Sequence, residues 1–125
     1  MHANEKLLRS VLDAIAAGDA VALAQLMADD MVVHVPGRSR IAGDHQGRGV
    51  FRARMRELTG ATLTIEPHDV LGSDDHAVGV YTMRLELPDR TVAWKHVNVY
   101  HVRDGKIVEV WENPFEQDVF DELFA

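Results

Sequence analysis

Cysteine is absent from this 125-residue chain. Its absence excludes a disulfide framework, a thiolate nucleophile and a cysteine-based zinc site. Long apolar runs are absent too: no stretch approaches the roughly 18 residues that suggest a membrane span, and the N-terminal segment has no apolar core of signal-peptide length. We therefore expect a cytoplasmic protein that does not enter a membrane.

Basic residues are scarce, since 13 lysines and arginines face 20 aspartates and glutamates and the formal net charge is −7. Such a charge repels phosphate backbones and anionic lipid surfaces, so nucleic acid and membranes are not expected partners. The hydrophobic fraction of 46% is ordinary for a globular protein. The length suits one domain over residues 1–125.

Apolar residues at helical spacing predict helices over 5–17, 20–28 and 50–58, and a short helix over 115–124. Gly18 is a natural stop for the first helix, and Asp19 is a natural N-cap for the second. The glycine-rich stretch 37–49 lacks the spacing of a phosphate-binding loop, so we predict a loop whose glycines serve turns.

Alternation and β-branched residues predict strands over 31–36, 61–71, 76–87, 91–102 and 106–113. Short turns link the last four, which therefore form an antiparallel meander. Because helices and sheet are segregated along the chain, the fold class is α+β. We expect a curved antiparallel sheet wrapped over about three helices.

The hairpin over 91–113 is the most informative stretch. Its alternation places four side chains on one face of the first strand: Trp94, His96, Asn98 and Tyr100. A two-residue primed turn at Asp104-Gly105 sets Asn98 opposite Trp111 and His96 opposite Asn113. Polar and aromatic side chains then converge on one wall.

The preceding hairpin extends this wall. A turn centred on Asp89-Arg90 sets Tyr81 opposite Asn98 and Met83 opposite His96. A mostly apolar wall with a few aimed polar groups is typical of a small-molecule pocket. We therefore expect a hydrophobic small-molecule ligand, contacted by Tyr81, Met83, Trp94 and Trp111.

The opposite face of the sheet is too apolar for water. It carries six valines, at positions 78, 80, 97, 99, 108 and 110. Simple alternation also places Glu112 at its rim, together with other charged residues. We expect this outer face to bind a second copy of the chain, giving a homodimer.

Four segments together resemble the SnoaL-like branch of the nuclear transport factor 2 superfamily, which also holds ketosteroid isomerases, limonene epoxide hydrolases and polyketide cyclases. They are AAGDAVALAQLMADDMVVHVPG at 16–37, AGDHQGRGVFRARM at 42–55, EPHDVL at 66–71 and VYHVRDGKIVEVWE at 99–112. The resemblance spans nearly the whole chain. It implies a cone-shaped α+β barrel with a deep internal pocket, and frequent dimers.

The catalytic residues of that superfamily match this chain poorly. The epoxide hydrolases use an Asp-Arg-Asp constellation, and the equivalent positions here hold Asn98, His96 and Asn113. The isomerases use a helix tyrosine and two pocket aspartates, which the predicted pocket face does not offer. The cyclases use a carboxylate near the last strand, for which Glu112 is the nearest candidate if a bulge turns it inward.

Histidine is the natural general base near neutral pH. His96 is the better candidate, and His34 could meet it across the pocket because Val33 and Val35 occupy the other face of its strand. The alternative is a buried histidine bonded to backbone, and it carries more weight for His34 than for His96. A metal site formed by these two histidines lacks a third ligand, so we expect neither metal nor cofactor.

Amide groups could support this chemistry. Asn98 and Asn113 could donate hydrogen bonds to a substrate oxygen as charge develops there, or could only satisfy strand ends. Tyr81 could act as an acid or fill the core. Trp94 and Trp111 would line a ring-shaped ligand with or without catalysis.

Two functions remain open at this point. The first is a cofactor-free acid/base enzyme, of isomerase, cyclase or hydrolase type, acting on a small hydrophobic carbonyl-bearing substrate such as a polyketide or terpenoid. The second is a non-catalytic binding module for a hydrophobic small molecule. A histidine beside two amides is more polar than passive binding requires, which favours the enzyme.

Overall fold

The computed structural model describes all 125 residues and has the predicted α+β class. Its elements follow in the order α1 (Ala3–Ala17), α2 (Ala20–Leu26), β1 (Met27–Val35), β2 (Gly43–Gln46), α3 (Val50–Thr59), β3 (Leu63–Gly72), β4 (His76–Glu86), β5 (Thr91–Arg103), β6 (Lys106–Pro114) and α4 (Gln117–Leu123). Strand β2 lies in the stretch that the sequence predicted to be a loop.

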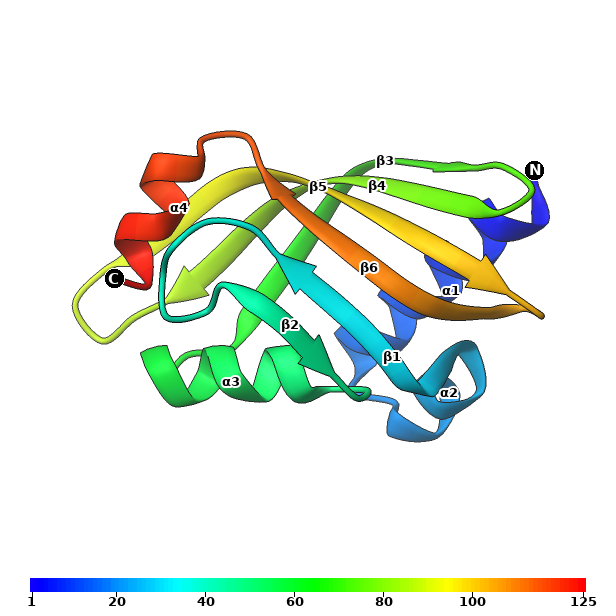
Figure 1. Ribbon diagram of the computed structural model, residues 1–125, viewed down its shortest axis with the longest axis horizontal. Helices are drawn as coiled ribbons and strands as arrows, with labels where there is room; N and C mark the ends of the chain where they lie inside the picture. The colour runs from blue at the N-terminus through cyan, green and yellow to red at the C-terminus, as the bar shows by residue number, and fades with distance from the viewer.

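The six strands form one curved sheet in the order β2-β1-β6-β5-β4-β3 (Figure 1). The end strands β2 and β3 do not pair, so the sheet is unclosed. The expectation of an entirely antiparallel sheet is wrong at one place, because β1 runs parallel to β6. That pairing joins the first half of the chain to the end of the meander and brings β1 to the pocket.

The first two helices begin and end where capping residues dictate. The C-cap Gly18 has a φ of 66°, which is accessible to glycine at little energetic cost. The Asp19 carboxylate accepts a hydrogen bond from the Ala22 backbone N–H and so caps α2. None of the four helices is both long and apolar enough to span a lipid bilayer.

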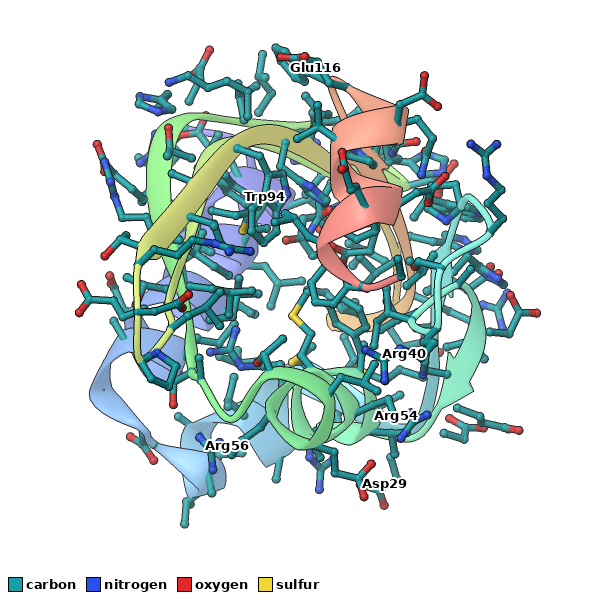
Figure 2. The ribbon with its side chains drawn as sticks, turned by 90° about the vertical axis from the view of Figure 1, so that its left-hand side faces the viewer. Asp29, Arg40, Arg54, Arg56, Trp94 and Glu116 are labelled. Atoms are coloured by element: carbon teal, nitrogen blue, oxygen red, sulfur yellow. The ribbon has the colours of Figure 1, made fainter.

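The core lies inside the curve of the sheet. Leu8, Val11 and Leu12 of α1 pack against it, as does Met55 of α3. Helix α4 and its C-cap residue close one end of the curve through Phe120 and Phe124, whose rings meet Trp94 edge-on at centroid distances of 5.7 and 6.3 Å. Figure 2 shows Trp94 between β5 and α4.

An extra residue in β6 decides which of its side chains face the core. The turn is of the predicted primed type, with φ values of 52° at Asp104 and 73° at Gly105. Val102 pairs with Ile107, but His101 pairs with Glu109, so Val108 is a bulged residue. Beyond the bulge, each side chain of β6 therefore lies on the face opposite to the predicted one.

The bulge corrects the predicted faces of β6. Val110 and Glu112, predicted on the outer face, are buried inside the curve. Trp111 and Asn113, predicted on the pocket wall, lie on the outer face. Val99 pairs with Trp111 and Val97 with Asn113, instead of the predicted pairs with Asn98 and His96.

Strands β4 and β5 pair two residues away from the predicted register, which leaves every face unchanged. Tyr81 therefore pairs with His96, and Met83 pairs with Trp94. Gly79 pairs with Asn98, and the Tyr81 phenol lies over this glycine. A Cβ atom at position 79 would lie 2.0 Å from the Tyr81 hydroxyl oxygen. The missing side chain thus makes room for the tyrosine.

We predict that Gly79→Ala lowers the free energy of unfolding by about 1–3 kcal/mol, because the new methyl group overpacks the core against Tyr81. Urea denaturation measures the change. A second substitution, Tyr81→Leu, should restore part of the lost stability by removing the clashing ring. Equal stability of Gly79→Ala and the wild-type protein would contradict the packing described here.

Candidate active site

Glu112 is the buried acid of the sheet. It lies on β6 opposite Asn98, and only 5% of its surface is exposed. Its Oε1 accepts a hydrogen bond from His96 Nε2 at 2.9 Å. The carboxylate therefore has a fixed orientation, which a residue on a mobile loop would lack.

His96 is in turn held by Trp94, whose indole Nε1–H donates to His96 Nδ1 at 3.0 Å. An indole nitrogen can only donate, so Nδ1 must be the acceptor and Nε2 must carry the ring proton. This assigns a neutral imidazole that donates to Glu112. Trp94, His96 and Glu112 form a buried hydrogen-bonded row from β5 to β6.

The second oxygen of Glu112 faces a cavity. Glu112 lines this space, and no protein group donates to its Oε2. The only buried side-chain polar atom without a partner is Asn98 Oδ1, so Oε2 is not sealed in the core. One carboxylate oxygen is thus held by the protein, and the other is available to a bound molecule.

The cavity has a volume of about 110 Å³ and 17 lining residues, of which 12 are hydrophobic, Tyr100 included. Its apolar walls come from all the layers around it, including Val11 and Ile15 of α1, Phe51 of α3 and Met83 of β4. The polar side chains in its lining are Arg48, Arg52, Asn98, Tyr100 and Glu112. This is a small apolar chamber with polar groups concentrated on β5, β6 and the start of α3.

Three polar groups form a second network beside Glu112. The hydroxyls of Tyr81 and Tyr100 are 2.8 Å apart, and Asn98 Nδ2 donates to the Tyr100 oxygen at 3.1 Å. Burial raises the pKa of both tyrosines well above the ordinary value. Both phenols therefore stay protonated near neutral pH, and Tyr100 can present a donor to a molecule in the cavity.

Sequence and structure comparisons place the fold in a family. The sequence-family model of the SnoaL-like domain matches residues 8–110 of this chain. This chain is a member of the SnoaL-like family. The match confirms the resemblance seen in the sequence. No curated protein matches the chain significantly.

Solved structures resemble this SnoaL-like domain over its whole length. Bal32a, from a soil-derived mobile gene cassette, has a TM-score of 0.86 and 29% identity over 98% of this chain and 97% of its own. A Xanthomonas campestris protein of unknown function with a cystatin-like fold has a TM-score of 0.84 and 26% identity, over 100% and 99% of the two chains. IdmH, a putative polyketide cyclase from Streptomyces antibioticus, has a TM-score of 0.70 and 22% identity, over 98% and 97%.

The residues predicted for the site are only partly brought together. His96 and Asn98 lie inside the curve next to Glu112, and Asn98 and Met83 line the cavity. Tyr81 and Trp94 are buried behind the cavity wall, where they hold Tyr100 and His96. His96 does not line the cavity. It is hydrogen-bonded to Glu112, whereas the sequence predicted that it would contact a substrate.

Three predicted site residues lie on the wrong side of the sheet. His34 faces outward because Val33 and Val35 occupy the core side of β1, and its ring stacks on Trp111 at 5.6 Å. Trp111 and Asn113 follow the reversed register of β6. Asn113 is exposed and donates to the Trp111 carbonyl oxygen at 3.0 Å. Their predicted placement in the pocket is wrong.

Four residues of the site escaped the sequence reasoning or stayed doubtful there: Arg48, Arg52, Tyr100 and Glu112. Tyr100 was placed on the pocket face by alternation but given no role. Arg48 lies in the stretch 37–49, which was predicted to be a loop, and Arg52 lies in the helix that follows it. Only the pairing of β2 with β1 shows where that stretch runs. For Glu112, a bulge was the one condition that would turn it inward, and that condition holds.

Outer-face charges surround His34. Its Nδ1 lies 2.7 Å from Asp44 Oδ1, and its Nε2 lies 2.8 Å from Glu109 Oε2. The hydrogen bond to Asp44, followed by that to Glu109, raises the pKa of His34 above 6.5. The His34 hydrogen bond also lowers the pKa of Glu109 below 4.5. Both shifts mark an ion pair that favours the charged forms.

We predict a pH-dependent stability from this pair. The raised pKa of His34 gives stability that is full below 6.5 and is lost as pH rises through the folded-state value. The lowered pKa of Glu109 gives stability that is full above 4.5 and is lost as pH falls through the folded-state value. The contribution is therefore largest between these limits.

Comparison of wild type with His34→Asn measures this contribution. Because the pair is partly exposed, the variant should lose at most about 1 kcal/mol of unfolding free energy near pH 5.5. The loss should be smaller near pH 9, where the wild-type ion pair no longer contributes. Glu109→Gln should show the same pH dependence, since it removes the other partner. A His34→Asn loss that is equal at both pH values would rule out this ion pair as its source.

Proposed function

We propose that this SnoaL-like domain is an acid/base enzyme acting on a small hydrophobic carbonyl compound, of the polyketide or terpenoid kind, without a cofactor. One observation carries the proposal: a buried carboxylate, Glu112, has one oxygen fixed by His96 and the other on an apolar cavity. A base positioned in this way is the central requirement for proton abstraction. The likeness to a putative polyketide cyclase supports the substrate class.

The proposed step begins with Glu112 as general base. Its Oε2 takes the proton from a carbon next to the substrate carbonyl, and the C–H electron pair moves into an enolate. An isomerase returns the proton to a different carbon. A cyclase lets the enolate carbon attack a second carbonyl of the same molecule, which forms the new C–C bond, and the proton goes to the new alkoxide.

The enolate oxygen needs a donor, and Tyr100 supplies one. Its oxygen accepts from Asn98 Nδ2, so its own proton is free for the substrate when the Tyr81 hydroxyl also donates to it. Donors that are already oriented stabilise developing charge at little reorganisation cost.

His96 is a positioning residue in this proposal. It touches Glu112 and not the cavity, and its neutral tautomer is set by Trp94. A hydrogen bond from an imidazole N–H holds the carboxylate in one rotamer and stabilises its charge. This role replaces the direct proton transfer that the sequence suggested for His96.

We predict that Glu112→Gln abolishes most of the activity. Small hydrophobic ketones and β-keto esters incubated in D₂O with the wild-type protein should take up deuterium next to the carbonyl, as measured by mass spectrometry. Glu112→Gln should lower the exchange rate about 10²- to 10⁴-fold, because the base is lost while the shape is kept.

Glu109→Gln is the matched control, because Glu109 is a carboxylate of the same strand on the outer face. It should leave the exchange rate unchanged. Exchange that survives Glu112→Gln would refute the assignment of the base. Ligands that bind without any exchange would support the alternative, a non-catalytic binding module, which the largely hydrophobic lining of the cavity also suits.

We also propose that the outer sheet face forms a homodimer. Val78, Val80, Val97 and Val99 lie half-buried on this face, beside Trp111. A contiguous apolar patch on a sheet is unfavourable in water and is suited to an identical patch on a second copy. Val108 remains part of the predicted patch, while Val110 does not.

We predict that Val99→Lys yields monomers, because a charge at the centre of this face would be buried without a partner. Sedimentation velocity at micromolar concentration measures the change. Val21→Lys is the control, since Val21 lies on α2 and is 72% exposed. A wild-type protein that is already monomeric, or a dimer that survives Val99→Lys, would show that this face is not the interface.

A further inference from the structure

Two arginines lie at the part of the cavity that proton transfer does not use. Arg52 is in the first turn of α3, and Arg48 lies two residues before the helix, next to its N-cap Gly49. Both side chains are half-buried, and both line the cavity together with the exposed Gly49. The chain has a net charge of −7, so two positively charged side chains at an apolar cavity differ in sign from the protein as a whole.

Arg52 has unused hydrogen-bonding capacity. A guanidinium carries five N–H donors, and the one hydrogen bond of Arg52 runs from Nη2 to the Leu63 carbonyl oxygen at 2.7 Å. Its remaining nitrogens are not among the sealed, unpartnered atoms of the core. They are therefore not sealed in the core, and Arg52 lines the cavity, so they can receive an acceptor.

Arg48 is anchored on one side only. Its Nη1 donates to the Met27 carbonyl oxygen at 3.2 Å and to the Asp29 carboxylate. These contacts hold the side chain in place at the cavity, and they leave Nε and Nη2 without a protein acceptor. The two arginines thus present fixed donors from neighbouring positions.

The surroundings of Arg52 favour a bound anion. Burial, followed by repulsion from Arg56, lowers the pKa of Arg52, while the charge of Glu112 opposes this shift. A guanidinium that has lost part of its hydration gains most from an anionic oxygen, because both the charge and the unused donors are then satisfied. Glu112 itself makes no hydrogen bond to Arg52 and lies deeper, bonded to His96.

We propose that the ligand is a small hydrophobic acid, whose carboxylate binds Arg52 with help from Arg48 while its apolar body fills the cavity toward Glu112. This deepens the proposed function by naming the substrate class. The cavity volume of about 110 Å³ bounds the enclosed body. A cavity of about 150 Å³ accommodates benzene, so the enclosed part of the ligand is no larger than a single ring, and the remainder with its acid group extends to the arginines.

Two probes of equal shape test the proposal: 3-phenylpropionate and its neutral amide, 3-phenylpropanamide. Chemical-shift titration of the ¹⁵N-labelled protein at fixed pH and ionic strength gives both dissociation constants. The wild-type protein should bind the acid about ten- to a hundredfold more tightly than the amide, as expected for charge-assisted hydrogen bonds. Arg52→Gln should remove this preference, and Arg52→Lys should keep part of it.

Arg54→Gln is the matched control, because Arg54 is an exposed arginine of the same helix, paired with Glu57. It should keep the full preference for the acid. Equal affinities for acid and amide in the wild type would overturn the proposal, as would a preference that survives Arg52→Gln or the failure of both probes to bind. The wild-type comparison needs no variant, so it stands even where Arg52→Gln disturbs the fold.

This experiment separates the two proposals, because it measures binding and not turnover. Glu112→Gln should retain the preference for the acid, since the arginines remain in place. A preserved preference together with deuterium exchange that does not depend on Glu112 would refute the enzyme mechanism and keep the hydrophobic-acid site. Glu112-dependent exchange without any preference would do the reverse.

Discussion

The hydrogen bond between His96 and Glu112 is the interaction on which the interior of this protein depends. It exists because a bulge at Val108 turns the second half of β6 over, so that a carboxylate enters the curve of the sheet. A buried carboxylate is costly unless it is paired and hydrogen-bonded. His96 supplies the hydrogen bond, and the charge of Arg52 interacts favourably with that of Glu112. The polar groups inside the curve therefore form one interdependent set.

The same set explains the aromatic residues around the cavity. Trp94 fixes the histidine tautomer from one side, and Tyr81 reaches Tyr100 across Gly79 from the other. Tyr81 stands behind Tyr100, which lines the cavity, and Trp94 stands behind His96, which in turn holds the cavity-lining Glu112. Rigid support of this kind keeps reactive groups within the narrow range of geometries that catalysis requires.

The fold was predictable from the sequence because its signals are local. Helical spacing, the Gly18 and Asp19 caps and the Asp104-Gly105 turn all lie where expected. The two-residue shift between β4 and β5 did no harm, because an even shift preserves the faces. The pairing of β1 with β6 joins distant segments, and no local pattern announces it.

The site was predictable only in part. His96 and Asn98 were placed correctly by alternation along β5, which has no bulge in that region. Residues 106–110, Lys-Ile-Val-Glu-Val, alternate in hydrophobicity too weakly to reveal an extra residue. One such residue reversed the positions of Glu112, Trp111 and Asn113 together. The placement of His34 was wrong for a different reason. Valines lie on both faces of its strand, so periodicity alone could not show which face is buried.

The two tryptophans lie on opposite faces of the sheet, so their fluorescence reports on two different environments. Trp94 is enclosed by the rings of α4 beside the His96 imidazole, whereas Trp111 lies across the sheet among His34, His76 and His101. Emission from the first reports on the hydrogen-bonded interior, and emission from the second reports on the outer face of the sheet. A single-tryptophan version of either kind thus isolates events on one side of a sheet that is only one strand-layer thick.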